Sequence, residues 1–118
     1  MYSAAVLDHF KNPRNAGDLP DATAVVEVTN PVCGDILRLA VRLDAGAIVE
    51  ARFKAQGCVT ALACASMLTG LLAGKSLDEG RRITAARISD ALGGLPQATF
   101  HGAQLASDAV AALLAELS

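Results

Sequence analysis

The hydrophobic pattern of the chain changes its period once, at Gly57, and this change constrains the fold more than any other feature of the sequence. Before this glycine, residues 36–43 and 48–54 alternate apolar and polar side chains, as half-buried antiparallel strands do. After it, residues 59–73 are apolar on nearly all sides, which is typical of a buried helix, and Gly74 should end that helix. Because the strands come first and the helices follow, the pattern predicts an α+β fold.

The two alternating segments should form a hairpin that turns at residues 44–46. In the second segment, the alternation places Val49, Ala51 and Phe53 on the buried face. A brief β-branched segment at residues 24–28 supplies one more strand. We therefore expect a three-stranded antiparallel meander.

Helices are also expected over residues 3–10, where Ser3 is the candidate N-cap, and over residues 85–92 and 102–117. The run Ser76-Leu77-Asp78-Glu79 has the form of a capping box and should open a further short helix. These helices are expected to pack on one face of the meander. The chain has 118 residues, of which 53% are hydrophobic, so it fits one globular domain over its whole length, residues 1–118.

Charge and composition exclude several classes of function. The formal net charge is -2 and the Lys and Arg residues are scattered, so no nucleic-acid-binding surface is expected. The longest apolar stretch, residues 59–72, is too short to cross roughly 30 Å of hydrocarbon, which predicts no membrane span. Residues 1–10 lack the basic leader and apolar core of a secretory signal. A cytoplasmic protein follows, in which the three cysteines are reduced and available for metal or sulfur chemistry.

Four residues form a candidate metal site, and each lies where a predicted strand or helix begins or ends. Cys33 and Asp35 flank Gly34 on the turn that enters the central strand, so their side chains should project to the same side. Cys58 precedes the long buried helix, whose N-terminal dipole favours a thiolate. His101 lies at the start of the last helix. Thiolate, carboxylate and imidazole are the ligand types that zinc and iron–sulfur clusters use.

Each candidate also has a simpler structural interpretation. Cys64 lies in the middle of the buried helix and is interpreted as a core residue. His9 is interpreted as a surface or helix-capping histidine. Asp35 taken alone would usually be a turn-forming residue. Taken singly, Cys33 and Cys58 are weaker signals than paired CxxC motifs would be.

A series of motifs runs in order along essentially the whole chain. They are Tyr2-Ser3, Val6, Asp8-His9-Phe10, Asn12-Pro13-Arg14-Asn15, Gly17, Cys33-Gly34-Asp35, Ala51-Arg52-Phe53-Lys54, Gly57-Cys58, residues 65–69 and residues 74–79. In this order they resemble the iron–sulfur cluster assembly scaffold family of the IscU and NifU N-terminal type. The resemblance implies a SufE/NifU-type fold and a scaffold or carrier that is not an enzyme. Such a protein receives sulfur from a cysteine desulfurase, takes up iron, builds a transient [2Fe-2S] cluster and passes it to acceptor apoproteins, and members also bind zinc at the same residues.

The resemblance assigns roles to the candidate residues. It implies that Cys33 and Cys58 ligate the cluster, that Asp35 keeps the cluster labile and can ligate metal, and that His101 is the histidine before the family's third cysteine. That cysteine, which often accepts the persulfide, is Gly102 here. A cysteine at position 102 is expected to project toward the metal without disturbing the core.

A second departure lies at residues 95–99, where the chaperone-recognition stretch of the IscU branch has lost its second proline and its lysine. Three hypotheses remain open. The chain is a working scaffold, or a zinc-binding module that interacts with a desulfurase without accepting persulfide, or an enzyme that uses Cys33 or Cys58 as a sulfur-transfer nucleophile. The first is favoured, and the last is the least supported because the sequence has no triad or phosphate loop. We expect a monomer or a weak homo-oligomer.

Overall fold

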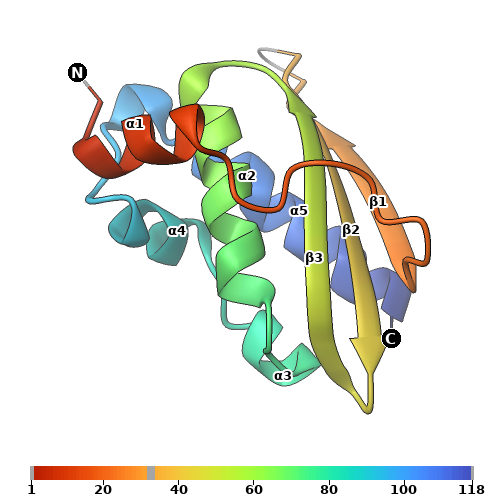
Figure 1. The fold of residues 1–118 in the computed structure, drawn as a ribbon. Coiled ribbons are helices and arrows are strands. Elements are labelled where there is room, and N and C mark those ends of the chain that lie inside the picture. Colours follow the sequence, from red (N-terminus) through yellow and green to blue (C-terminus); the bar gives the residue numbers. More distant parts are fainter. Residues whose placement is uncertain (1, 32–33, 118) are drawn as a thin grey trace.

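The computed structural model describes residues 2–31 and 34–117, and these form a three-stranded sheet with helices on one side (Figure 1). The elements are α1 (Ala4–Lys11), β1 (Ala24–Thr29), β2 (Ile36–Asp44), β3 (Ala47–Gln56), α2 (Val59–Leu72), α3 (Leu77–Gly80), α4 (Ala85–Ala91), a 3₁₀ turn (Gln97–Thr99) and α5 (His101–Leu117). The sheet has the order β1-β2-β3 and both pairings are antiparallel. The predicted α+β meander with helices on one face is therefore confirmed.

The core lies between the sheet and two helices. Of the three strands, β3 is the one that α2 mainly contacts, and α5 packs against β1 and β2 (Figure 1). The inward side chains of β2, Leu37, Leu39 and Val41, are at most 1% exposed. Leu68 of α2 and Leu113 of α5 meet them and are fully buried. Burial of such a side chain stabilises the fold by about 1.5–3 kcal/mol each, so this layer contact holds the two helices in place.

Strand β3 departs from the predicted alternation at its start. Val49 was expected to be buried, but it is 42% exposed, and Ile48 is buried in its place. The pairing with β2 explains the difference, because Arg42 pairs with Glu50 while Leu43 pairs with Ile48. Val49 is thus the extra residue of a β-bulge, and an extra residue shifts the inside–outside alternation by one.

The segment between α1 and β1 fastens the edge of β3. Phe53 N–H donates to the Asn15 carbonyl at 3.0 Å, and Gly17 N–H donates to the Phe53 carbonyl at 2.8 Å. A second clamp joins the start of β3 to the chain after α2, because Ile48 N–H donates to the Lys75 carbonyl and Gly74 N–H donates to the Ile48 carbonyl, both at 2.7 Å. Two stretches of the outer edge of β3 are therefore paired within the chain.

His9 has a more specific role than the surface or capping position expected for it. Its Nδ1 lies 2.8 Å from Ser66 Oγ on α2, and the same hydroxyl accepts a 2.8 Å bond from Arg14 N–H. Burial first, and then the nearby Arg14 charge, lowers the pKa of His9, against a smaller opposing effect of Asp8. His9 is thus a half-buried link between α1, the following loop and α2.

The helix termini agree with the sequence signals. Ser3 caps α1 by accepting a bond from Val6 N–H, and Ser76 and Glu79 form the expected reciprocal capping box. In α1 only Val6 is buried, while Leu7 and Phe10 are 37% and 39% exposed. Within residues 2–31 and 34–117, no helix is long and apolar enough to cross a bilayer.

The β2–β3 hairpin contains a residue in an unfavourable backbone conformation. Asp44 pairs with Ala47, which leaves Ala45 and Gly46 as a two-residue loop, and their φ angles are +53° and +80°. Positive φ at both positions suits a type I′ turn, in which asparagine is preferred over alanine at the first position. We predict that Ala45→Asn raises the free energy of unfolding by about 0.5–1 kcal/mol, measured by urea denaturation. Ala45→Val, with a β-branched side chain at positive φ, should lower it, and equal stability of the two variants would contradict the strain.

Candidate metal centre

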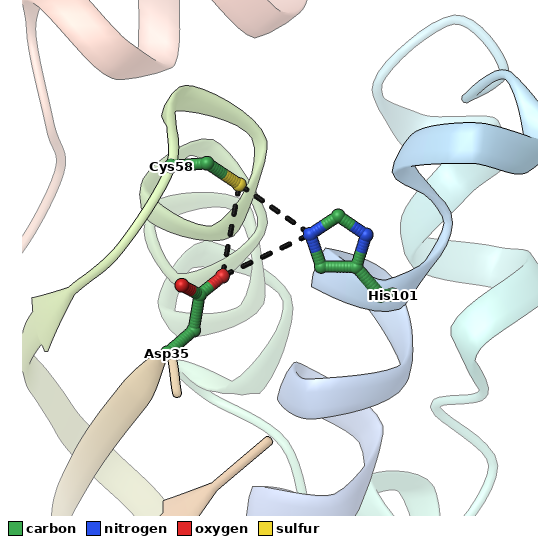
Figure 2. A group of neighbouring side chains, drawn as sticks. All are labelled: Asp35, Cys58 and His101. Atoms are coloured by element: carbon green, nitrogen blue, oxygen red, sulfur yellow. Dashed lines mark hydrogen bonds and ion pairs between the residues drawn. The ribbon is translucent and has the colours of Figure 1, made fainter. Parts of the chain in front are cut away.

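Three of the four predicted ligands meet at one end of the sheet (Figure 2). Cys58 Sγ lies 3.5 Å from His101 Nε2 and 3.7 Å from Asp35 Oδ2, and His101 Nε2 lies 3.8 Å from the same carboxylate oxygen. Asp35 is 8% exposed, His101 is half-buried and Cys58 is exposed. The carboxylate therefore forms the floor of the site and the thiol its accessible side.

The local structure explains why these side chains converge. Asp35 immediately precedes β2, and the turn before it is held by two backbone bonds of 2.8 Å, from Gly34 N–H to the Asn30 carbonyl and from Asn30 N–H to the Asp35 carbonyl. Cys58 is the N-cap residue of α2, and only Gly57 separates it from the end of β3. His101 is the first residue of α5. Each ligand type thus sits at an element end, where the backbone of the sheet and of two helices determines its position.

The spacing suits a metal ion. With metal–ligand bonds of about 2.0–2.3 Å, two ligand atoms of a tetrahedral zinc site lie roughly 3.3–3.8 Å apart. The three separations, 3.5, 3.7 and 3.8 Å, agree with that geometry. The thiol and the imidazole are borderline-soft ligands that suit zinc and iron, and the carboxylate adds a harder, more exchangeable one. Cys58 is also the N-cap residue of α2, so the positive end of the helix dipole lies beside its thiol.

The fourth predicted ligand, Cys33, lies outside the described residues. Its neighbour Gly34 is described, with φ of +76°, a backbone conformation that glycine adopts without strain. Cys64 does not join the group. It is fully buried, and burial, with a smaller contribution from Cys58, raises the pKa of its thiol to about 12. The interpretation of Cys64 as a core residue agrees with this burial.

Gly102 does not face open space, which corrects the expectation that a cysteine there would fit without disturbing the core. The residue is buried, and a Cβ added to it would lie 3.1 Å from Ala61 N and 3.1 Å from Thr60 Cγ2. Both atoms belong to the first turn of α2. The missing side chain therefore lets the start of α5 pack closely against the start of α2, and His101 follows it toward Cys58.

The comparisons with known proteins agree with this fold and site. The sequence matches the family described as the NifU-like N terminal domain over residues 1–117. The chain belongs to this family. It is 43% identical over 110 residues to the iron-sulfur cluster assembly scaffold protein IscU 1 of Archaeoglobus fulgidus, a match that covers 93% of this chain and 72% of that protein. It is 40% identical over 119 residues to the scaffold protein IscU of Escherichia coli K12, covering 98% of this chain and 92% of the relative.

Two solved structures show the same fold. A nitrogen-fixing NifU-like protein (N-terminal) from Brucella abortus superimposes with a TM-score of 0.77 at 20% identity, covering 97% of this chain and 92% of that one. A putative iron-sulfur cluster assembly scaffold protein for the SUF system from Fervidobacterium islandicum also gives a TM-score of 0.77 at 20% identity, covering 96% of both chains. At this level of identity the likeness concerns the fold alone.

The contrast between the two described cysteines of this NifU-like domain yields a prediction. At pH 8, a pKa of about 12 leaves roughly one Cys64 thiol in ten thousand ionised, and burial also blocks access. In a Cys33→Ser variant, Cys58 and Cys64 are the two remaining cysteines. Iodoacetamide should label Cys58 quickly and Cys64 only after unfolding in guanidinium chloride. Peptide mass spectrometry assigns the labelled residue. Rapid native labelling of Cys64 would contradict the buried position.

Proposed function

We propose that this chain is an iron–sulfur cluster assembly scaffold that holds iron or a [2Fe-2S] cluster as transient cargo on Cys33, Asp35, Cys58 and His101. The observation that carries the proposal is the convergence of Asp35, Cys58 and His101, whose ligand atoms lie within 4.8 Å of one another, in a chain that belongs to the NifU-like family. The 43% and 40% identical relatives are named scaffold proteins, which supports a carrier and not an enzyme.

The ligand residues would have different roles in a carrier, because they bind iron with different strengths. Cysteine thiolates bind iron–sulfur clusters firmly, and a histidine can replace a cysteine as a ligand. The Asp35 carboxylate is a harder ligand that binds iron in a sulfur-rich site less firmly than a thiolate does. Because Cys58 is exposed, an acceptor can reach the cargo from that side while Asp35 supports it from the floor. A firm thiolate on the open side and an exchangeable carboxylate beneath it suit cargo that must leave.

Sulfur delivery requires a partner, which we propose to be a cysteine desulfurase, with acceptor apoproteins as the final recipients. Of the described thiols, Cys58 is exposed and Cys64 is buried, so Cys58 is the one that a donor persulfide can reach. The Cys58 thiolate would attack the outer sulfur of the donor persulfide, forming one S–S bond while the donor's S–S bond breaks and its thiolate leaves. A cytoplasmic location and a monomeric or weakly oligomeric state stay predictions.

A zinc-binding module is the second candidate function. The tight packing at Gly102 supports it, because this position has little room for the cysteine that often accepts the persulfide. A thiol at this position would lie between the first turns of α2 and α5 and must displace one of them by a few tenths of an ångström. The four proposed ligands nevertheless provide a complete tetrahedral set for zinc. Metal analysis of protein purified with and without oxygen separates the candidates, because a cluster is lost in air and zinc is retained.

The ligand assignment predicts a specific pattern of metal binding. The metal-free protein should bind one Co²⁺ or Zn²⁺, and Cys58→Ala, Cys33→Ala or His101→Ala should weaken binding at least tenfold. Cys64→Ala is the matched control and should bind as the wild type does, because this thiol lies outside the group. Affinity should fall as the pH falls, since the thiolates and the imidazole must lose protons to bind. Competition with a chelator measures the affinity, and wild-type affinity in both Cys58→Ala and Cys33→Ala would contradict the assignment.

The role of position 102 can be tested separately. After treatment with a desulfurase and cysteine, Gly102→Cys should carry more persulfide than the wild type, because a thiol at a helix start is activated. It should also be less stable by about 1 kcal/mol, since the added Cβ meets Ala61 and Thr60. Gly102→Ala is the control, with the same loss of stability and no added persulfide. Equal persulfide loading of the wild type and Gly102→Cys, measured by mass spectrometry, would show that the missing cysteine does not limit sulfur acceptance.

A further inference from the structure

Gly57 leaves room for one face of the Asp35 side chain. A Cβ built on Gly57 would lie 2.6 Å from Asp35 Cγ, 2.7 Å from its Oδ1 and 3.0 Å from its Cβ. Side-chain carbons do not approach this closely in folded proteins, so any larger residue at position 57 must displace the carboxylate. The other carboxylate oxygen, Oδ2, faces Cys58 and His101 (Figure 2). One oxygen of Asp35 thus rests against Gly57 while the other enters the site.

The register of the sheet makes this contact unavoidable. Ile36 pairs with Gln56, so the next residues outward, Asp35 and Gly57, lie opposite each other at the end of the β2–β3 ladder. Opposed side chains in such a ladder normally keep their Cβ atoms about 4.5–5.5 Å apart. A Cβ added to Gly57 would lie only 3.0 Å from Asp35 Cβ, so the two strands can be this close here because Gly57 has no side chain.

We propose that Gly57 is a positioning residue for the site: because it has no side chain, it leaves the space that the Asp35 carboxylate occupies when Oδ2 lies beside Cys58 and His101. This inference rests on the proposed function, and it names what sets the exchangeable ligand of that site. Asp35 is short and 8% exposed, so a methyl group at position 57 turns the carboxylate away from both partners. The exposed thiol and the imidazole remain, and the oxygen ligand is lost.

The test compares Gly57→Ala with the same substitution at another glycine of positive φ, Gly17, where an added Cβ meets open space. Gly57 has φ of +159°, and Gly17 has φ of +126° with nothing within 4 Å of an added Cβ. Gly17→Ala therefore also places a side chain at positive φ, without touching Asp35. We expect Gly57→Ala to weaken Co²⁺ binding 10–100-fold, the usual effect of removing the support of a metal ligand, and Gly17→Ala to leave it unchanged. The sulfur-to-cobalt charge-transfer band should persist while the ligand-field bands shift.

A double-mutant cycle separates positioning from general damage. In an Asp35→Ala background, Gly57→Ala should have no further effect on Co²⁺ affinity, because the displaced group is already gone. Additive losses of affinity in the cycle would overturn the proposal, as would wild-type affinity in Gly57→Ala. Thermal unfolding of each variant confirms that the fold persists.

A metal-free measurement distinguishes this inference from the proposed function. In the metal-free protein, the ¹⁵N resonance of His101 Nε2 should shift alike in Gly57→Ala and Asp35→Ala, since both remove the carboxylate that lies 3.8 Å away, and should stay in place in Gly17→Ala. If the wild-type protein binds no Co²⁺ while the variants show this pattern of shifts, the proposed metal-binding function is wrong and the positioning role of Gly57 stands. An unmoved His101 resonance in Gly57→Ala would overturn the positioning role itself.

Discussion

The antiparallel pairing of β2 with β3 is the constraint on which the site depends. It places Asp35, at the start of one strand, beside Gly57, at the end of the next, and Cys58 follows Gly57 as the first turn of α2 begins. A slip of one residue in this pairing would turn Asp35 to the other face of the sheet and separate it from Cys58. The inward Leu37, Leu39 and Val41 oppose such a slip, because it would move them out of the core. The hydrophobic core thus fixes the register of β2 and β3, and the register determines where the ligand atoms lie.

The second constraint is the close contact between the starts of α2 and α5. Gly102 allows it, and His101 reaches Cys58 only because its helix begins there. The site is therefore assembled at the junction of one strand pair and two helix starts. Two of the glycines next to its ligands, Gly57 before Cys58 and Gly102 after His101, make the close contacts possible. The glycines control distances, while the ligand residues provide the chemistry.

Most of the fold follows from local patterns that the sequence displays. The change of period at Gly57, the Ser3 cap and the Ser76–Glu79 capping box depend on neighbouring residues alone, so they could be predicted. The convergence of Asp35, Cys58 and His101 could also be anticipated from their places at element ends. The exposure of Val49 could not, because a bulge arises from the pairing of two strands and leaves no mark in the alternation of one.

The neighbours of Gly57 and Gly102 could not be predicted from local sequence patterns either, because they belong to segments that are distant along the chain. Gly57 marked the end of the sheet in the sequence, and its contact with Asp35 depends on strand register. Gly102 was expected to face the metal, but the distance between two helices decides which neighbours it meets. The signal that could have directed attention to Gly57 is its position immediately before Cys58, where a glycine at the end of a strand often marks a close approach of another group.

The clamps on β3 have a consequence for how this molecule behaves among others of its kind. A sheet of three strands has two edges, and an unpaired edge can template the addition of a strand from another chain. Here the backbone groups of Phe53 and Ile48 are already bonded within the chain, by Asn15, Gly17, Gly74 and Lys75. These two positions of β3 therefore have no backbone groups left to bond a strand of another molecule. The chain thus uses its own connecting segments to cover part of the edge of the strand that leads into Cys58, which leaves less of that edge for pairing with another molecule.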